Sequence, residues 1–141
     1  KRMAVLAEGR SARTDAWCVA RFQVADLLCL ELHSGRTHQI RVHLAHIGHP
    51  VVGDPVYGAG GSRRISGSAR LIAEAVERAA GRQALHAASL AFKHPVTEEA
   101  LEFRSEWPAD LRLALELAAG DSVSVAPDEA LRYLLFFNRD G

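Results

Sequence analysis

The segment Leu30–Gly58, LELHSGRTHQIRVHLAHIGHPVVGDPVYG, decides how the rest of this 141-residue chain is interpreted. Its apolar residues alternate at first and then recur at the spacing of a helix. The pattern predicts a strand that ends at Ser34-Gly35, followed by a short helix with Thr37 as its N-cap and Gly48 at its end. An extended piece comes next and closes in the turn Gly53-Asp54-Pro55.

Arg41 lies in this helix, next to an apolar stripe formed by Ile40, Leu44 and Ile47. A guanidinium at the edge of a core is stable when it meets a carboxylate or a phosphate. Arg36 lies one turn before Arg41, ahead of the helix start, and faces solvent or a phosphate group. From spacing alone, the favoured interpretation is a structural ion pair at Arg41 and an exposed Arg36.

The remaining periodicities predict alternating helices and strands. In order, they are strands at 16–24 and 27–33 joined as a hairpin, a helix at 69–80 that ends before Gly81, a buried strand at 85–94, a half-exposed strand at 101–107 and a helix at 108–117. The loop 58–68, GAGGSRRISGS, carries Arg63 and Arg64. It lacks the ending of a P-loop, so contact with a polyanion backbone and a plain flexible loop both remain open.

Composition and charge are those of an ordinary soluble globular protein. No apolar run approaches a membrane span, and no signal peptide is visible. The zero net charge hides an asymmetry, because residues 1–94 hold 13 Lys+Arg and 7 Asp+Glu whereas residues 95–141 hold 4 and 10. Segregated charge suits a face for a polyanion, although a chance difference between solvated faces is the stronger interpretation by itself. Cys18 and Cys29 lie in predicted neighbouring strands, where a disulfide is conceivable, but free buried thiols in a reducing compartment are the favoured interpretation.

Five histidines gather between positions 33 and 49, which raises the question of a metal site. They are His33, His38, His43, His46 and His49. His43 and His46 lie one helical turn apart, but the H-E-x-x-H pattern is absent and no cysteine cluster supports a site. The sequence therefore favours a chain without a metal.

The segment GRTHQIRVHLAHIGHPVVGDPVYG closely resembles the signature of the RluA-type RNA pseudouridine synthases. Downstream, Arg82–Phe103, RQALHAASLAFKHPVTEEALEF, is similar to the closing motif of that family, in the expected order. The opening KRMAV, with Gly9-Arg10 and Ala12, is similar to the segment before the signature. Two long motifs in order make the resemblance specific, and it spans about residues 1–117.

The resemblance implies an α+β fold, with a mixed, largely antiparallel sheet flanked by helices. On this interpretation residues 1–120 are the C-terminal part of a pseudouridine synthase catalytic domain, with an arm at 1–14 and a flexible loop at 58–68. Residues 121–141 form a tail whose role is not predicted.

The function implied is isomerisation of uridine to pseudouridine in structured ribosomal or transfer RNA, with no cofactor. Arg41 matches the family's active-site arginine, which pairs with a nucleophilic aspartate, and Leu90 matches an apolar residue that packs on the pocket. The other assignments that follow are RNA binding by Arg36, His38, Lys1, Arg2, Arg63 and Arg64, and maintenance of the motif's shape by Gly35, Asp54 and Tyr57.

The chain departs from the family pattern at two motifs. Neither the HRLD-type motif of the nucleophile nor the YxAxV-type motif of the active-site tyrosine is present. We therefore expect a cytoplasmic fragment, inactive alone, whose partners are RNA and the upstream half of its own domain, with no membrane. An open sheet edge or uncovered apolar face is expected where that half docks. A non-catalytic RNA-binding fragment and a His-dependent metal protein remain as alternatives.

Overall fold

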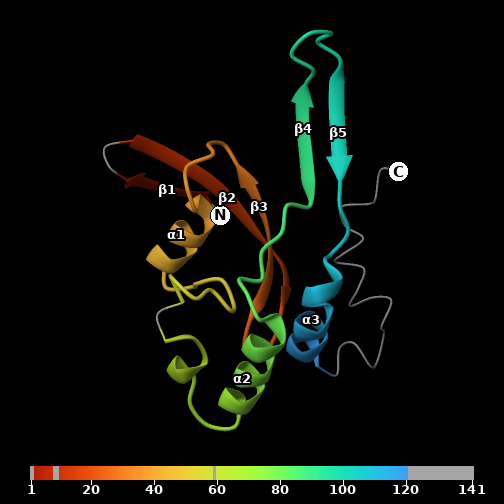
Figure 1. Cartoon of the computed structure of the whole chain (residues 1–141). Helices are drawn as coiled ribbons and strands as arrows, with labels where there is room; N and C mark the ends of the chain where they lie inside the picture. Colours follow the sequence, from red (N-terminus) through yellow and green to blue (C-terminus); the bar gives the residue numbers. More distant parts are fainter. Residues whose placement is uncertain (1, 8–9, 59, 121–141) are drawn as a thin grey trace.

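The computed structural model describes residues 2–7, 10–58 and 60–120, so the tail at 121–141 lies outside the described residues (Figure 1). The elements are β1 (Arg2–Ala7), β2 (Arg10–Arg21), β3 (Asp26–Leu32), α1 (Gln39–His46), η1 (Gly61–Arg64), α2 (Ala69–Ala80), β4 (Ser89–Lys93), β5 (Ala100–Arg104), η2 (Ala109–Leu111) and α3 (Arg112–Ala119). The α+β class is confirmed. Every strand pair in the described part of the chain is antiparallel.

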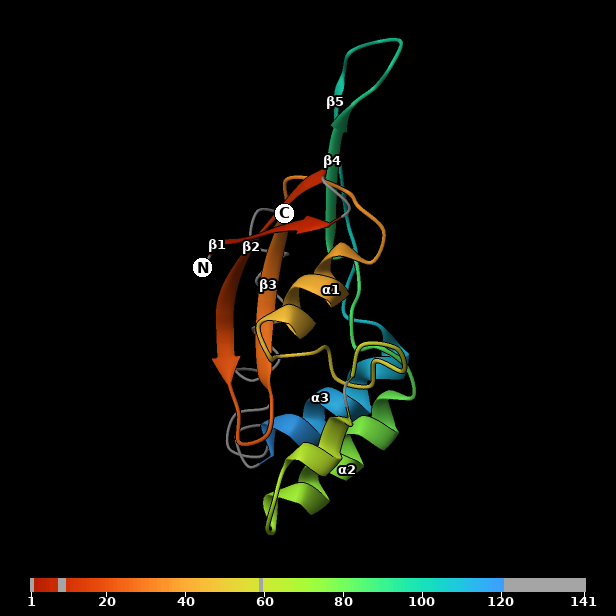
Figure 2. The ribbon, with the colours of Figure 1, turned by 90° about the vertical axis from the view of Figure 1, so that its left-hand side faces the viewer.

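The first sheet has the order β1-β2-β3 and is covered on one face by α1 (Figure 2). The predicted hairpin is confirmed, because β2 and β3 pair antiparallel with Asp15 opposite Glu31 and Ala16 opposite Leu30. Ala16 is buried on the covered face together with Leu44 of α1. This first core holds the signature helix on the sheet.

The start of α1 differs from the sequence prediction. The N-cap is His38, in the left-handed region with φ 52°, and no side chain caps the helix. The prediction of Thr37 as the N-cap is therefore wrong, because the following Gln39 side chain accepts the Arg36 backbone N–H and tightens the entry turn. The helix does end as predicted, with Gly48 at φ 82° directly after the C-cap.

A second core lies between α2 and α3, at one end of the molecule (Figure 1). The bounds of α2 are those predicted, and Gly81 follows in the left-handed region at φ 66°. Leu111 is fully buried between the helices. The last helix begins later than predicted, because Pro108 is extended and η2 precedes α3. Within the described residues, no helix combines the length and the apolar character needed to span a membrane.

The hairpin of β4 and β5 projects away from both cores (Figures 1 and 2). The predicted buried strand at 85–94 is wrong in two respects. Only Ser89–Lys93 is a strand, and every residue in it is exposed. Alternation correctly placed Leu90 and Phe92 on one face, but both side chains are exposed there.

Candidate functional site

The centre of the candidate site is an ion pair between Arg41 of α1 and Asp54 of the turn that follows α1. Nε of Arg41 donates to Oδ2 of Asp54 at 2.8 Å, and Nη2 donates to Oδ1 at 2.8 Å. The Asp54 side chain is 0% exposed and that of Arg41 is 11% exposed. Two parallel charge-assisted hydrogen bonds fix both distance and orientation. Of the two partners that the sequence allowed for Arg41, a carboxylate and a phosphate, the structure supplies a carboxylate from this chain.

The electrostatics of the pair follow from this contact. The Arg41 guanidinium holds the pKa of the Asp54 carboxyl well below its usual range, against the effect of burial, and backbone N–H groups lower that pKa further. The same hydrogen bond raises the pKa of Arg41. Both groups therefore stay ionised at neutral pH, and the pair carries no net charge.

The turn around Asp54 is built so that the carboxylate has one position. Oδ1 of Asp54 also accepts the backbone N–H groups of Val56 at 2.9 Å and Tyr57 at 3.0 Å. Any Cβ at Gly58 would clash with the Asp54 carbonyl, and any Cβ at Gly53, with φ 75°, would clash with the Arg82 carbonyl. The glycines of the GDPVYG segment are therefore required by close backbone approach.

Tyr57 joins the pair to the start of the helix. Cζ of Arg41 lies 5.1 Å from the centroid of the Tyr57 ring, a cation–π contact. The Tyr57 hydroxyl and Nδ1 of His38 are hydrogen-bonded at 3.1 Å. We call these four residues, His38, Arg41, Asp54 and Tyr57, the Arg41 cluster. All of them were singled out from the sequence, but only the structure shows that they are in contact.

A buried polar network beneath the cluster anchors α1 to β2. The Gln39 amide donates to Oγ1 of Thr14 at 3.0 Å, and that oxygen is 2.7 Å from Nδ1 of His43. All three residues are buried. Burial also lowers the pKa of His43, which favours its neutral form. Gln39 and Thr14 were not predicted as site residues, and no periodicity in the sequence signals them.

This network affects the alternative interpretation in which the histidines bind a metal ion. Nδ1 of His43 is hydrogen-bonded with Oγ1 of Thr14, and the residue is 2% exposed. Among the described residues, the single group of three metal-ligating side chains does not include His43 or His46. The geometry therefore assigns His43 a role in holding α1 on the sheet.

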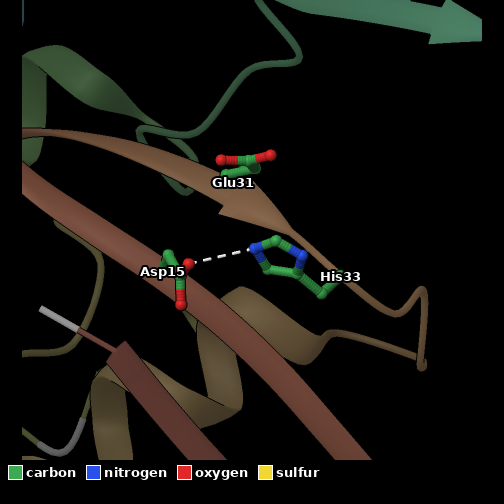
Figure 3. Close-up of side chains that lie close together, drawn as sticks. All are labelled: Asp15, Glu31 and His33. Carbon is green, nitrogen blue, oxygen red and sulfur yellow. Dashed lines mark hydrogen bonds and ion pairs between the residues drawn. The ribbon is translucent and has the colours of Figure 1, made fainter.

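That one group consists of Asp15, Glu31 and His33, from the adjacent strands β2 and β3 and the residue after β3 (Figure 3). Its ligand atoms lie within 4.8 Å of one another, and Nε2 of His33 is 3.0 Å from Oδ2 of Asp15. However, Arg13 donates to both carboxylate oxygens of Asp15. A cation would have to displace this guanidinium. The sequence did not single out Asp15 or Glu31, because only the strand register places them opposite each other.

The other predicted site residues are placed apart from the Arg41 cluster or lie outside the description. Gly35 and Arg36 are exposed in the loop before α1, and Arg63 and Arg64 are exposed in η1. Leu90 is 58% exposed on β4. Lys1 lies outside the described residues, and Arg2 is placed only as part of strand β1.

Comparison with known proteins finds relatives that are named as pseudouridine synthases. No family model matches the chain. It is 43% identical over 115 residues to an uncharacterized RNA pseudouridine synthase of Chlorobaculum parvum, a match that covers 78% of this chain and 34% of that protein. It is 41% identical over 125 residues to the ribosomal large subunit pseudouridine synthase D of Xanthomonas campestris, covering 89% and 37%. The protein of the same name from Escherichia coli K12 is 42% identical over 119 residues, covering 84% and 36%.

The aligned segments are long enough to include the candidate site. Because the Xanthomonas match covers 89% of the chain, it includes the Arg41 cluster and the β4–β5 hairpin wherever it begins. The chain spans about a third of the length of the curated relatives it matches. Identity at this level over most of a chain indicates common descent. The chain therefore belongs to the RluA-type family of RNA pseudouridine synthases.

Proposed function

We propose that this chain is part of an enzyme that isomerises uridine to pseudouridine in structured RNA. The observation that carries the proposal is the Arg41 cluster, in which a family signature holds an ionised guanidinium in one orientation. The reaction breaks the N1–C1′ bond of the target nucleotide, turns the uracil and joins it to C1′ through C5. C5 then loses its proton and N1 ends protonated, so the product is an isomer of uridine and no cofactor is needed. The target base has to leave its stack, which costs a few kcal/mol that contacts in the pocket recover.

In this reaction Arg41 pairs with a carboxylate nucleophile, keeps it ionised and orients it. Asp54 is not suited to be that nucleophile. Its side chain is buried, and both of its oxygens already accept hydrogen bonds from Arg41. The nucleophile is therefore supplied from outside the Arg41 cluster, by the HRLD-type motif that this chain lacks.

The remaining part of the catalytic domain is the first proposed partner. The register of the hairpin places Leu90 opposite Phe103 and Phe92 opposite Leu101, so these four side chains share one face. Leu90, Phe92 and Phe103 are exposed, and the two phenylalanine rings stack at 5.9 Å. Exposed apolar faces of this kind mark contact surfaces. The longer relatives carry the additional chain that would cover it, with Leu90 at the wall of the pocket.

RNA is the second partner. Arg36, Arg63 and Arg64 are exposed cations suited to phosphate contacts, which make binding depend steeply on salt. Two of the relatives are named for the large ribosomal subunit, so ribosomal RNA is the substrate we favour over transfer RNA. We also propose that the enzyme works in the cytoplasm.

A chimera tests the proposal. This chain replaces the matching 119 residues of the Escherichia coli enzyme, and pseudouridine formation is measured on large-subunit ribosomal RNA from a strain without that enzyme. We expect conversion by the chimera, none by the 141-residue chain alone, and loss of conversion with Arg41→Ala.

Other outcomes have a definite meaning. A folded chimera that binds the RNA without converting it would favour the non-catalytic RNA-binding function. Conversion by the 141-residue chain alone would mean that a carboxylate within it is the nucleophile. Binding that does not weaken with salt would remove the assignment of Arg36, Arg63 and Arg64 to phosphate contacts.

A further inference from the structure

We propose that Asp54 is a positioning residue for the reaction. It holds Arg41 by one edge of the guanidinium so that the other edge stays open for a second carboxylate. The inference rests on the proposed function, because that second carboxylate belongs to the nucleophile. It adds a role for a residue that the sequence assigned only to the shape of a turn.

The distribution of hydrogen bonds over the Arg41 guanidinium is the first observation. A guanidinium has five N–H donors in a planar fork, enough to bind two carboxylates along two edges. Asp54 takes the edge formed by Nε and Nη2. Nη1 has no hydrogen-bond partner within residues 2–7, 10–58 and 60–120, and it is not among their buried unpartnered atoms. The open edge is therefore accessible even though the side chain is only 11% exposed.

The rigidity of Asp54 is the second observation. Its carboxylate is held by two backbone N–H groups in addition to Arg41, and it is fully buried. Gly53 and Gly58 approach the carbonyls of Arg82 and Asp54 so closely that neither position has room for a Cβ, so the turn is closely packed against backbone on both sides of Asp54. The direction of the open edge is therefore set by the backbone of the turn, and not by the rotamer of a surface arginine.

The face of the guanidinium is also restrained. Cζ of Arg41 lies over the Tyr57 ring at 5.1 Å from its centroid, and the Tyr57 hydroxyl is hydrogen-bonded to His38. Rotation of the guanidinium out of its plane would break the cation–π contact and both bonds to Asp54. Since catalysis depends on placement within fractions of an ångström, a residue that fixes this plane affects turnover more than substrate binding.

Nuclear magnetic resonance of the 141-residue chain provides the first test, independent of activity. The chain is labelled with ¹⁵N-arginine, and the Nε–H and Nη signals of Arg41 are followed. We expect slow hydrogen exchange and restricted rotation of the guanidinium in the natural chain, and fast exchange and rotation in Asp54→Asn. The matched control is Asp110→Asn, which removes the same charge from the exposed pair with Arg82 and leaves the Arg41 signals unchanged. Fast rotation of Arg41 in the natural chain would overturn the proposal.

Kinetics of the chimera provide the second test. With Asp54→Asn we expect kcat to fall about a hundredfold while KM changes by no more than about twofold, the pattern of lost orientation. Asp54→Glu, which keeps the carboxylate, should recover part of kcat, and Asp110→Asn should change neither constant. An equal kcat in a folded Asp54→Asn chimera would refute the positioning role. Absence of conversion by the unsubstituted chimera would instead refute the proposed function.

A further variant covers the case in which Asp54→Asn does not fold. Arg41→Lys keeps a cation that is able to pair with Asp54, but an ammonium has no second planar edge. We expect this variant to fold, by circular dichroism and thermal melting, and to lose as much kcat as Arg41→Ala. Full turnover with Arg41→Lys would show that the open edge is not used.

Discussion

Two Arg–Asp pairs in this chain have the same chemistry and opposite surroundings. Arg41 and Asp54 form two bonds of 2.8 Å, with the carboxylate completely buried. Arg82 and Asp110 also form two bonds, of 2.7 and 3.2 Å, but the Asp110 side chain is 59% exposed. An exposed pair is screened by water and salt, whereas removal of one partner of a buried pair leaves a desolvated charge. The comparison therefore indicates which pair the fold depends on.

The two arginines also differ in the hydrogen bonds that they make outside the ion pair. Arg82 uses Nη1 to donate to the carbonyls of Gln83 and Leu85, so its hydrogen bonds order the segment between α2 and β4. Arg41 makes no such backbone contact within the described residues, and its Nη1 edge is left open. Arg82, with hydrogen bonds at all three of its nitrogens, is structural, whereas Arg41 is held with a free edge that is prepared to bind.

The largest expected effect is that of Asp54→Ala on stability. This change leaves the largely buried Arg41 unpaired and removes the acceptor of two backbone N–H groups, so we expect the free energy of unfolding to fall by about 3 kcal/mol. Urea denaturation of the 141-residue chain measures it. Asp110→Ala serves as the control and should shift the urea midpoint much less. Equal shifts in the two variants would show that burial does not separate the pairs.

A smaller effect on stability is expected from Gly53→Ala. Gly53 lies where the turn that holds Asp54 contacts the backbone of Arg82. The Cβ of an alanine there would clash with the Arg82 carbonyl, in a backbone conformation with φ 75°. We expect a loss of about 2 kcal/mol in the free energy of unfolding. Gly48→Ala is the matched control, because φ is 82° but nothing lies within 4 Å of the added carbon. The difference between the two variants isolates the contact between the turn and Arg82.

The smallest effect concerns pH. The pKa values of Asp54 and Asp110 are both lowered in the folded chain, so each carboxylate stabilises the fold above its unfolded pKa, about 4, and this contribution is lost as pH falls through the folded pKa. Urea midpoints measured between about pH 6 and pH 3 should fall in the natural chain. The fall in the urea midpoint should be smaller in Asp54→Asn than in the natural chain. In Asp110→Asn it should be nearly the same as in the natural chain, because solvent screens that pair. A steeper fall in Asp54→Asn would contradict this sign.

Several elements were predictable because their signals are local. The bounds of α2 follow from helical periodicity and a terminal glycine, and the β2–β3 hairpin follows from alternation around a short link. The prediction of Thr37 as N-cap failed because His38 takes the N-cap position in the left-handed region, and the Gln39 side chain accepts the Arg36 backbone N–H in the entry turn. The prediction of a buried β4 failed because alternation identifies an apolar face without saying what covers it.

The sequence by itself determined the family, the helix that carries Arg41 and the requirement that this guanidinium meet a carboxylate or a phosphate. Only the tertiary structure decided that the acid is Asp54, that Tyr57 and His38 complete the cluster, and that one edge of the guanidinium is left open. It also decided that Asp15, Glu31 and His33 meet across two strands. The physical reason is that periodicity and capping act over a few residues, whereas the partner of a buried charge is set by how separate segments of the backbone approach one another.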